Sequence, residues 1–165
     1  MTVFEYICNH SYSLISLASW LIVLKIIEKY NFYNYIGYNK YHLIQSHAFR
    51  YVLSAISYVY MGHGMYSIAI EGKDRQHIII AYFLQLFLEM SWFIVLYTMN
   101  MLRTSAIISV FNVLLSIYNF LTWYSMGTVI GTCILPYIIV SFLNLLFNYN
   151  IINATYVYKS EKSQQ

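Results

Sequence analysis

An almost wholly apolar run covers residues 78–99, and its clearest polar interruptions are Gln85 and Glu89. An α-helix needs about 20 apolar residues to cross the hydrocarbon core of a bilayer at 1.5 Å per residue, so the run predicts a transmembrane helix. Within it Tyr82, Gln85, Glu89 and Trp92 recur at spacings of three, four and three, and therefore project from one face. A carboxyl group in mid-membrane is costly unless it is protonated, paired or hydrated, so this face should look into a bundle or a cavity.

Other apolar segments of similar length lie on both sides of this run. Together they predict an all-α membrane protein, a single five-helix transmembrane bundle over residues 1–165 with a polar C-terminal tail. The expected spans are residues 11–30, 47–70, 78–99, 104–124 and 129–152. Pro136 falls in the first two turns of the last span, where a missing backbone hydrogen bond is tolerated. The long polar connection at residues 31–46 is either a lid over a cavity or a mobile connector.

Polar side chains also recur at helical spacing in the other spans. The second span carries Tyr51, Ser54 and Tyr58 along one stripe. The stripe of the last span consists of Tyr137, Ser141, Asn144 and Asn148. In the fourth span the stripe consists of Ser105, Ser109, Asn112, Ser116, Asn119 and Trp123. Small and polar residues are what membrane helices use to pack against one another, so packing alone explains the fourth stripe best.

The composition fits a multi-pass membrane protein, since 60% of the residues are hydrophobic and only 9% are charged. We read the net charge of +3 as a sign of topology rather than of nucleic-acid binding. With five spans, most Lys and Arg residues fall on the side of the C-terminus, which predicts a cytosolic C-terminus. Cys8 and Cys133 have no partners at metal-ligand spacing, so we expect no metal site and no cofactor.

Four stretches resemble the translocator protein family, also called tryptophan-rich sensory proteins or peripheral benzodiazepine receptors. They are YVYMGHGMY from Tyr58, YFLQLFLEMSW from Tyr82, TWYS from Thr122 and LPYIIVSFLNLLFNY from Leu135. The resemblance implies a five-helix membrane protein that binds a hydrophobic planar ligand, a porphyrin (tetrapyrrole) or a sterol. It also implies a possible homodimer, and a location in the mitochondrial outer membrane or the bacterial envelope. The family's sterol-recognition pattern retains Tyr149 here, although Asn153 stands where that pattern has a basic residue.

We therefore expect an integral membrane receptor or carrier whose bundle encloses the ligand. The candidate ligand-binding residues are Tyr51, Ser54, Tyr58, Gln85, Glu89, Trp92, Asn144 and Asn148, with Tyr149 as a sterol contact. We expect Glu89 to be neutral and to donate a hydrogen bond to another helix, with Tyr58 or Asn144 as the partner. The alternatives are a small proton-coupled transporter that uses Glu89 and a membrane interaction subunit that binds no ligand. An enzyme is not expected, because no catalytic constellation is present and tryptophans that match those of the family are missing.

Overall fold

The computed structural model describes a bundle of long helices. It covers residues 11–30, 47–70 and 76–162, and it places the side chains of residues 11–29, 52–70 and 76–153. The helices are α2 (Ser11–Tyr30), α3 (His47–Ile70), α4 (Gln76–Tyr97), α5 (Leu102–Tyr124), α6 (Thr128–Thr132) and α7 (Leu135–Lys162). The connection at residues 31–46, for which the sequence suggests either a lid or a mobile connector, lies outside the described residues.

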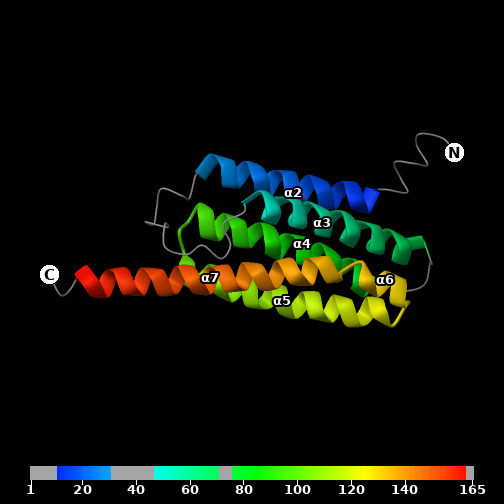
Figure 1. Cartoon of the computed structure of the whole chain (residues 1–165). Coiled ribbons are helices and arrows are strands. Elements are labelled where there is room, and N and C mark those ends of the chain that lie inside the picture. The colour runs from blue at the N-terminus through cyan, green and yellow to red at the C-terminus, as the bar shows by residue number, and fades with distance from the viewer. Residues whose placement is uncertain (1–10, 31–46, 71–75, 163–165) are drawn as a thin grey trace.

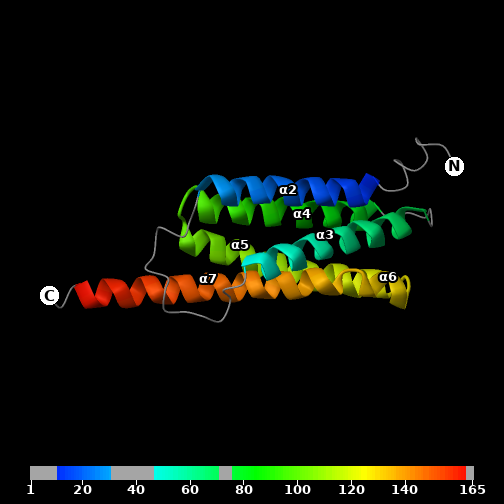
Figure 2. The same cartoon turned by 45° about the horizontal axis from the view of Figure 1, so that its top comes forward.

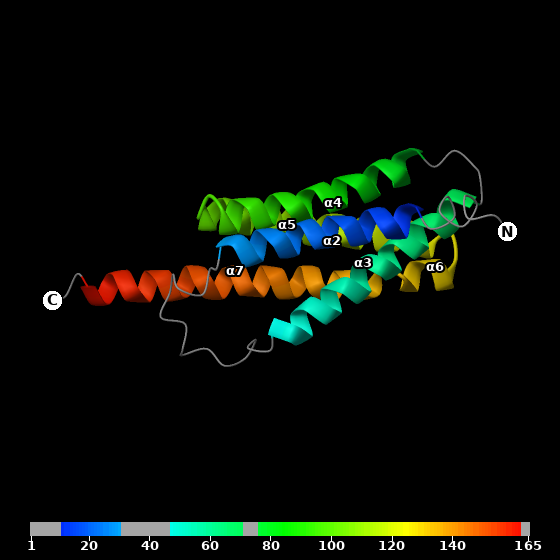
Figure 3. The ribbon, with the colours of Figure 1, turned by 90° about the horizontal axis from the view of Figure 1, so that it is seen from above.

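The five long helices alternate in direction and surround a common core (Figure 1). Neighbouring pairs in contact are α2 with α3, α3 with α7, α7 with α5, α5 with α4, and α4 with α2. The contacts therefore close a ring in the order α2, α3, α7, α5, α4. Figures 2 and 3 show that α3 crosses its neighbours at an oblique angle and that α7 extends beyond the other helices at its C-terminal end.

Hydropathy supports membrane crossing for most of this ring. Among the described residues, four segments are long and apolar enough to cross a membrane: Ser11–Lys29, Gln76–Tyr97, Leu102–Tyr124 and Thr128–Asn153. The predicted count of five spans is thus not reached by this criterion. Helix α3 is long enough, with 24 residues, but Gly62, His63 and Gly64 interrupt its apolar sequence.

The last predicted span is divided into two helices. The sequence suggests that the chain continues through Pro136, but α6 ends at Thr132 and α7 begins at Leu135. Proline has no N–H, and its ring clashes with the carbonyl group four residues earlier, which here belongs to Thr132. The junction instead uses tighter bonds, from Cys133 N–H to Ile130 O at 3.1 Å and from Ile134 N–H to Gly131 O at 3.4 Å. The apolar segment ends at Asn153, next to the expected end of the span at residue 152, whereas the helix α7 continues to Lys162.

A close backbone approach on one side and hydrogen bonds on the other hold α2 against its neighbours. A Cβ atom at Gly62 of α3 would lie 2.5 Å from the Cα atom of Ser13, so only glycine permits this approach of the two backbones. On the other side, the hydroxyl groups of Ser16 and Tyr82 are 2.6 Å apart, and Tyr82 also donates to the Tyr12 carbonyl at 2.9 Å. These contacts hold α2 to both α3 and α4.

Candidate functional site

The polar stripes of three helices meet in the interior of the bundle. In α4, Gln85 and Glu89 have at most 1% of their surface exposed, as the spacing of the stripe predicts. In α5, every polar residue of the stripe from Ser105 to Asn119 is buried, and so is Asn144 in α7. Since the apolar sides of these helices face outward, the polar groups must satisfy one another inside the bundle.

Glu89 is at the centre of this arrangement and accepts hydrogen bonds from two other helices. Asn144 of α7 donates through its Nδ2 atom to Oε1 of Glu89 at 2.9 Å. Tyr137 of α7 donates through its hydroxyl group to Oε2 at 3.1 Å, and Nδ2 of Asn112 in α5 donates to the same oxygen. The carboxyl group therefore connects α4 with both α5 and α7.

Gln85, one turn before Glu89, extends the network. Its amide nitrogen donates to the side-chain oxygen of Asn112, to the Asn112 carbonyl at 3.1 Å and to the Tyr137 hydroxyl at 3.3 Å. Its amide oxygen accepts from Asn119 Nδ2 at 3.3 Å. We call Gln85, Glu89, Asn112, Tyr137 and Asn144 the central polar cluster.

Two apolar layers enclose the central polar cluster along the bundle axis. The layer towards α6 includes Tyr58, Met61, Met65 and Trp123, and it meets the cluster at Tyr137. The layer at the opposite end consists of buried residues of α2, α4 and α7: Val23, Ile27, Trp92, Phe93, Leu96, Tyr97 and Ile151. The cluster is therefore a polar layer between apolar ones, where hydrogen bonds are shielded from water.

Four buried polar atoms have no hydrogen-bond partner within the described part of the chain. They are the Tyr58 hydroxyl, the indole nitrogens of Trp92 and Trp123, and Oδ1 of Asn119. Tyr58 packs edge-on against Tyr137, with ring centroids 5.8 Å apart, so its hydroxyl lies in the neighbourhood of the cluster. Trp92 follows Glu89 by three residues on the same face of α4. Buried groups of this kind are costly without a partner.

The predicted site residues do not all come together. Tyr58, Gln85, Glu89, Trp92 and Asn144 lie in the cluster or beside it. Asn148 is buried one turn beyond Asn144. Its side-chain oxygen accepts from the Ser105 hydroxyl at 2.9 Å and its amide nitrogen donates to the Asn144 carbonyl at 3.2 Å, so it is joined to the cluster through the Asn144 backbone. Ser54 is only partly buried, and Tyr149 is 62% exposed on the outside of α7. Tyr51 is not among the residues whose side chains the structure describes.

Two members of the cluster, Asn112 and Tyr137, are not among the predicted site residues, although each stands in the predicted polar stripe of its helix. A usable signal was the short turn between α4 and α5, since residues at equal distances from such a turn face each other in an antiparallel helix pair. Glu89 and Asn112 stand at nearly equal distances from this turn, which spans residues 98–101. For Tyr137 the signal is helical spacing, which puts it on the same face of its helix as Asn144. Its hydrogen bond to Glu89 depends on which helices meet in the bundle, and spacing along one helix does not contain that information.

The expected bonding of Glu89 is corrected in part. Asn144 is a partner of Glu89, as predicted, but its amide nitrogen donates to the carboxyl group and does not accept from it. Tyr58 is not a partner, because its hydroxyl makes no hydrogen bond with a described residue. Among the residues that the structure covers, no group of three or more His, Cys, Asp or Glu side chains could hold a metal ion.

Comparison with known proteins identifies one family. Residues 35–153 match the TspO/MBR family, and this match includes α3, α4, α5, α6 and the membrane-spanning part of α7. The central polar cluster lies wholly within the matched region. No match was found among curated proteins or among solved structures.

Proposed function

The chain belongs to the TspO/MBR family, and from that premise we propose that it is a membrane receptor or carrier for a hydrophobic planar ligand. The ligand is a porphyrin or a sterol, and it binds within the bundle beside the central polar cluster. In this proposal α3 also crosses the membrane, which makes five spans together with the four more apolar segments. The C-terminus is cytosolic. The protein acts by binding, and no enzymatic step is assigned to it.

The observation that carries the proposal is the pair of buried polar groups without partners beside the cluster. Ligand sites are mostly apolar enclosures with a few placed polar groups that orient the ligand. The Tyr58 hydroxyl and the Trp92 indole nitrogen meet this description, because both side chains are at most 1% exposed and neither polar atom is hydrogen-bonded to a described residue. A ligand carboxylate or hydroxyl group would supply the missing acceptor or donor.

A ligand titration tests this proposal. Purified full-length protein in detergent is titrated with protoporphyrin or with cholesterol, and tryptophan fluorescence is recorded. The chain has three tryptophans, so Trp92→Phe and Trp20→Phe variants assign the signal. We expect saturable quenching by the bound ligand that Trp92→Phe reduces more than Trp20→Phe does. Absence of saturable binding of either ligand would instead support an interaction subunit whose polar stripes only pack helices.

A second candidate, a proton-coupled carrier, rests on Glu89 itself. Among the described buried side chains Glu89 is the only acidic one, and ionisable groups inside a bundle often mark ion or proton pathways. Ligand flux into sealed vesicles, measured from about pH 5 to 9, tests coupling in the range where a buried carboxyl group can titrate. A carrier loses the pH dependence of flux in Glu89→Gln and keeps it in Glu28→Gln, whose side chain is exposed.

A further inference from the structure

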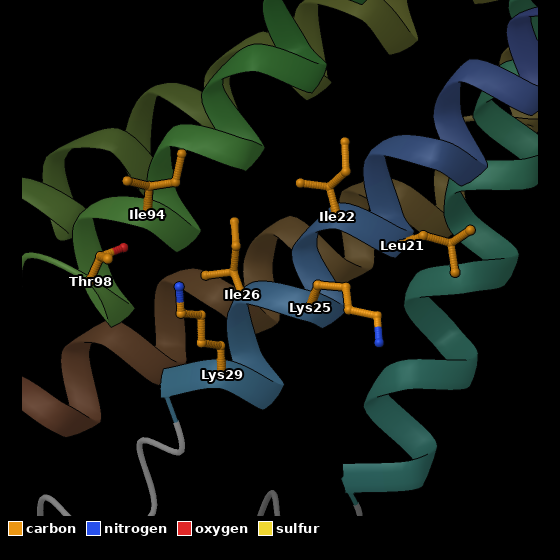
Figure 4. Close-up of a pocket in the computed structure, with 7 residues that line it drawn as sticks. All are labelled: Leu21, Ile22, Lys25, Ile26, Lys29, Ile94 and Thr98. Atoms are coloured by element: carbon orange, nitrogen blue, oxygen red, sulfur yellow. The ribbon is translucent and has the colours of Figure 1, made fainter.

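A groove of about 500 Å³ lies on the outside of the bundle between α2 and α4. Figure 4 shows the residues that line it: Leu21, Ile22, Lys25, Ile26, Lys29, Ile94 and Thr98. None of the predicted ligand-binding residues and no member of the central polar cluster is among them. The groove is therefore a separate feature from the site described above.

The groove opens towards the lipid and not towards the core. Leu21 and Ile22 of α2 are 51% and 48% exposed, whereas Val23 and Ile27 on the opposite side of the same helix are buried. Ile94 of α4 is also exposed. Since the walls are branched aliphatic side chains within two candidate membrane spans, their natural neighbour is a hydrocarbon chain.

Two lysines stand at the end of this apolar groove where both helices leave the membrane-spanning segment. Lys29 reaches towards Thr98, which directly follows the end of α4 at Tyr97, whereas the ammonium group of Lys25 points away from Lys29 (Figure 4). Lys25 forms an ion pair with Glu28 at 3.3 Å, but both side chains are largely exposed, at 83% and 64%. Exposed pairs of this kind are weak, so a stronger anion can compete for the lysine. Lysine stems of this length lie along apolar surface while their ammonium groups stay at headgroup level.

We propose that this groove binds an anionic phospholipid, with one acyl chain against Ile22, Ile26 and Ile94 and with its headgroup phosphate at Lys29, while Lys25 adds a second positive charge near the same end. An apolar channel that ends in cations is complementary to a molecule with a long hydrocarbon chain and a negative head. A zwitterionic lipid is bound less well, because its own cation opposes the lysines. The position also agrees with the expected topology, since the cytoplasmic leaflet is rich in anionic lipids and these lysines lie at the expected cytosolic end.

Native mass spectrometry of the full-length protein tests the proposal. The protein is reconstituted into phosphatidylcholine bilayers that contain a minor share of phosphatidylglycerol, and the lipids that stay bound after extraction are counted by headgroup. We expect phosphatidylglycerol to be enriched over its share in the bilayer. Lys29→Gln should lower this enrichment about fivefold, as expected for one cation beside an anionic headgroup. Lys25→Gln should lower it less, because the Lys25 ammonium group points away from Lys29. The matched control is Arg103→Gln, at the same end of the bundle but outside the groove lining, and it should leave the enrichment unchanged.

A second pair of variants tests the acyl-chain contact. Ile22→Trp fills the groove, whereas Ile107→Trp makes the same change at an exposed position of α5 away from it. Ile22→Trp should remove the retained lipid, and Ile107→Trp should not. Lack of enrichment in the parent protein, or an equal loss in Arg103→Gln, would overturn the proposal. A dimer that only Ile22→Trp converts to a monomer would also overturn it, because a second copy of the chain would then occupy the groove.

Discussion

At the scale of single residues, Glu89 connects three helices through its hydrogen bonds. Its two carboxyl oxygens accept from Asn112, Tyr137 and Asn144, which belong to two other helices. A side chain that cannot accept leaves those donors unpaired in a layer shielded from water. Glu89 is thus a structural residue whether or not a ligand binds beside it.

Two substitutions separate loss of the hydrogen bonds from loss of the acid. Glu89→Leu should lower the free energy of unfolding by about 2 kcal/mol, at the roughly 0.6 kcal/mol per hydrogen bond typical of membrane helices. Glu89→Gln should cost less than half of that, because its amide oxygen still accepts and its volume is nearly the same. Unfolding in mixed detergent measures both, and equal losses in the two variants would contradict this account of the cluster.

At the scale of helices, the contact of α2 with α3 depends on one glycine. A Cβ atom at Gly62 would meet backbone atoms of Ser13 at 2.5 and 2.8 Å and the Tyr12 carbonyl oxygen at 2.7 Å. Backbone atoms cannot move aside as the end of a side chain can, so the whole of α2 has to shift. The contact between α2 and α3 is therefore sensitive to a single methyl group.

Gly62→Ala should destabilise the protein by about 1–3 kcal/mol, the usual cost of overpacking a well-packed contact. Gly127→Ala is the matched control, since a Cβ atom there would find its nearest neighbour, Ile130 Cδ1, at 3.8 Å. Thermal unfolding in detergent compares the two variants. A Gly62→Ala protein that melts with the parent would show that α2 is not held to α3 at this point.

Hydropathy predicts these helices well, because the apolar length needed to cross a bilayer is a property of consecutive residues. The bounds predicted for the first two helices coincide with those of α2 and α3, and α4 begins two residues earlier than expected. The break at Pro136 was not foreseen, since it depends on a clash between backbone groups rather than on hydrophobicity. The sequence also predicts α3 as a membrane span, although α3 is less apolar than the four segments that meet the hydropathy criterion.

At the scale of the whole molecule, the number of spans determines the topology. If α3 crosses the membrane together with the four more apolar segments, the two termini lie on opposite sides. A C-terminal reporter should then be protected from protease added outside the membrane, and an N-terminal one should be cleaved. Two protected or two cleaved reporters would mean that α3 does not cross.

The sequence predicts which helix faces meet at the candidate site, but it does not predict which residues bond to one another there. Helical spacing alone indicates that Gln85, Glu89 and Asn144 face the interior, because a polar group cannot face lipid at that depth. Which of these groups bond to one another depends on the order of helices around the ring, and spacing along one helix does not contain that order. This is why helical spacing places Tyr137 on the same face as Asn144 but does not predict its hydrogen bond to Glu89.

The central claim is that a ligand uses the polar groups beside the cluster, and Tyr58→Phe tests it most directly. Because the Tyr58 hydroxyl is buried and has no described partner, removing it should not lower stability, and the ring still packs against Tyr137. Porphyrin affinity should fall about fivefold in Tyr58→Phe, the value of one hydrogen bond. Affinity should be unchanged in Tyr60→Phe, whose side chain is exposed on the same helix. Equal porphyrin affinity in the parent and both variants would contradict the account.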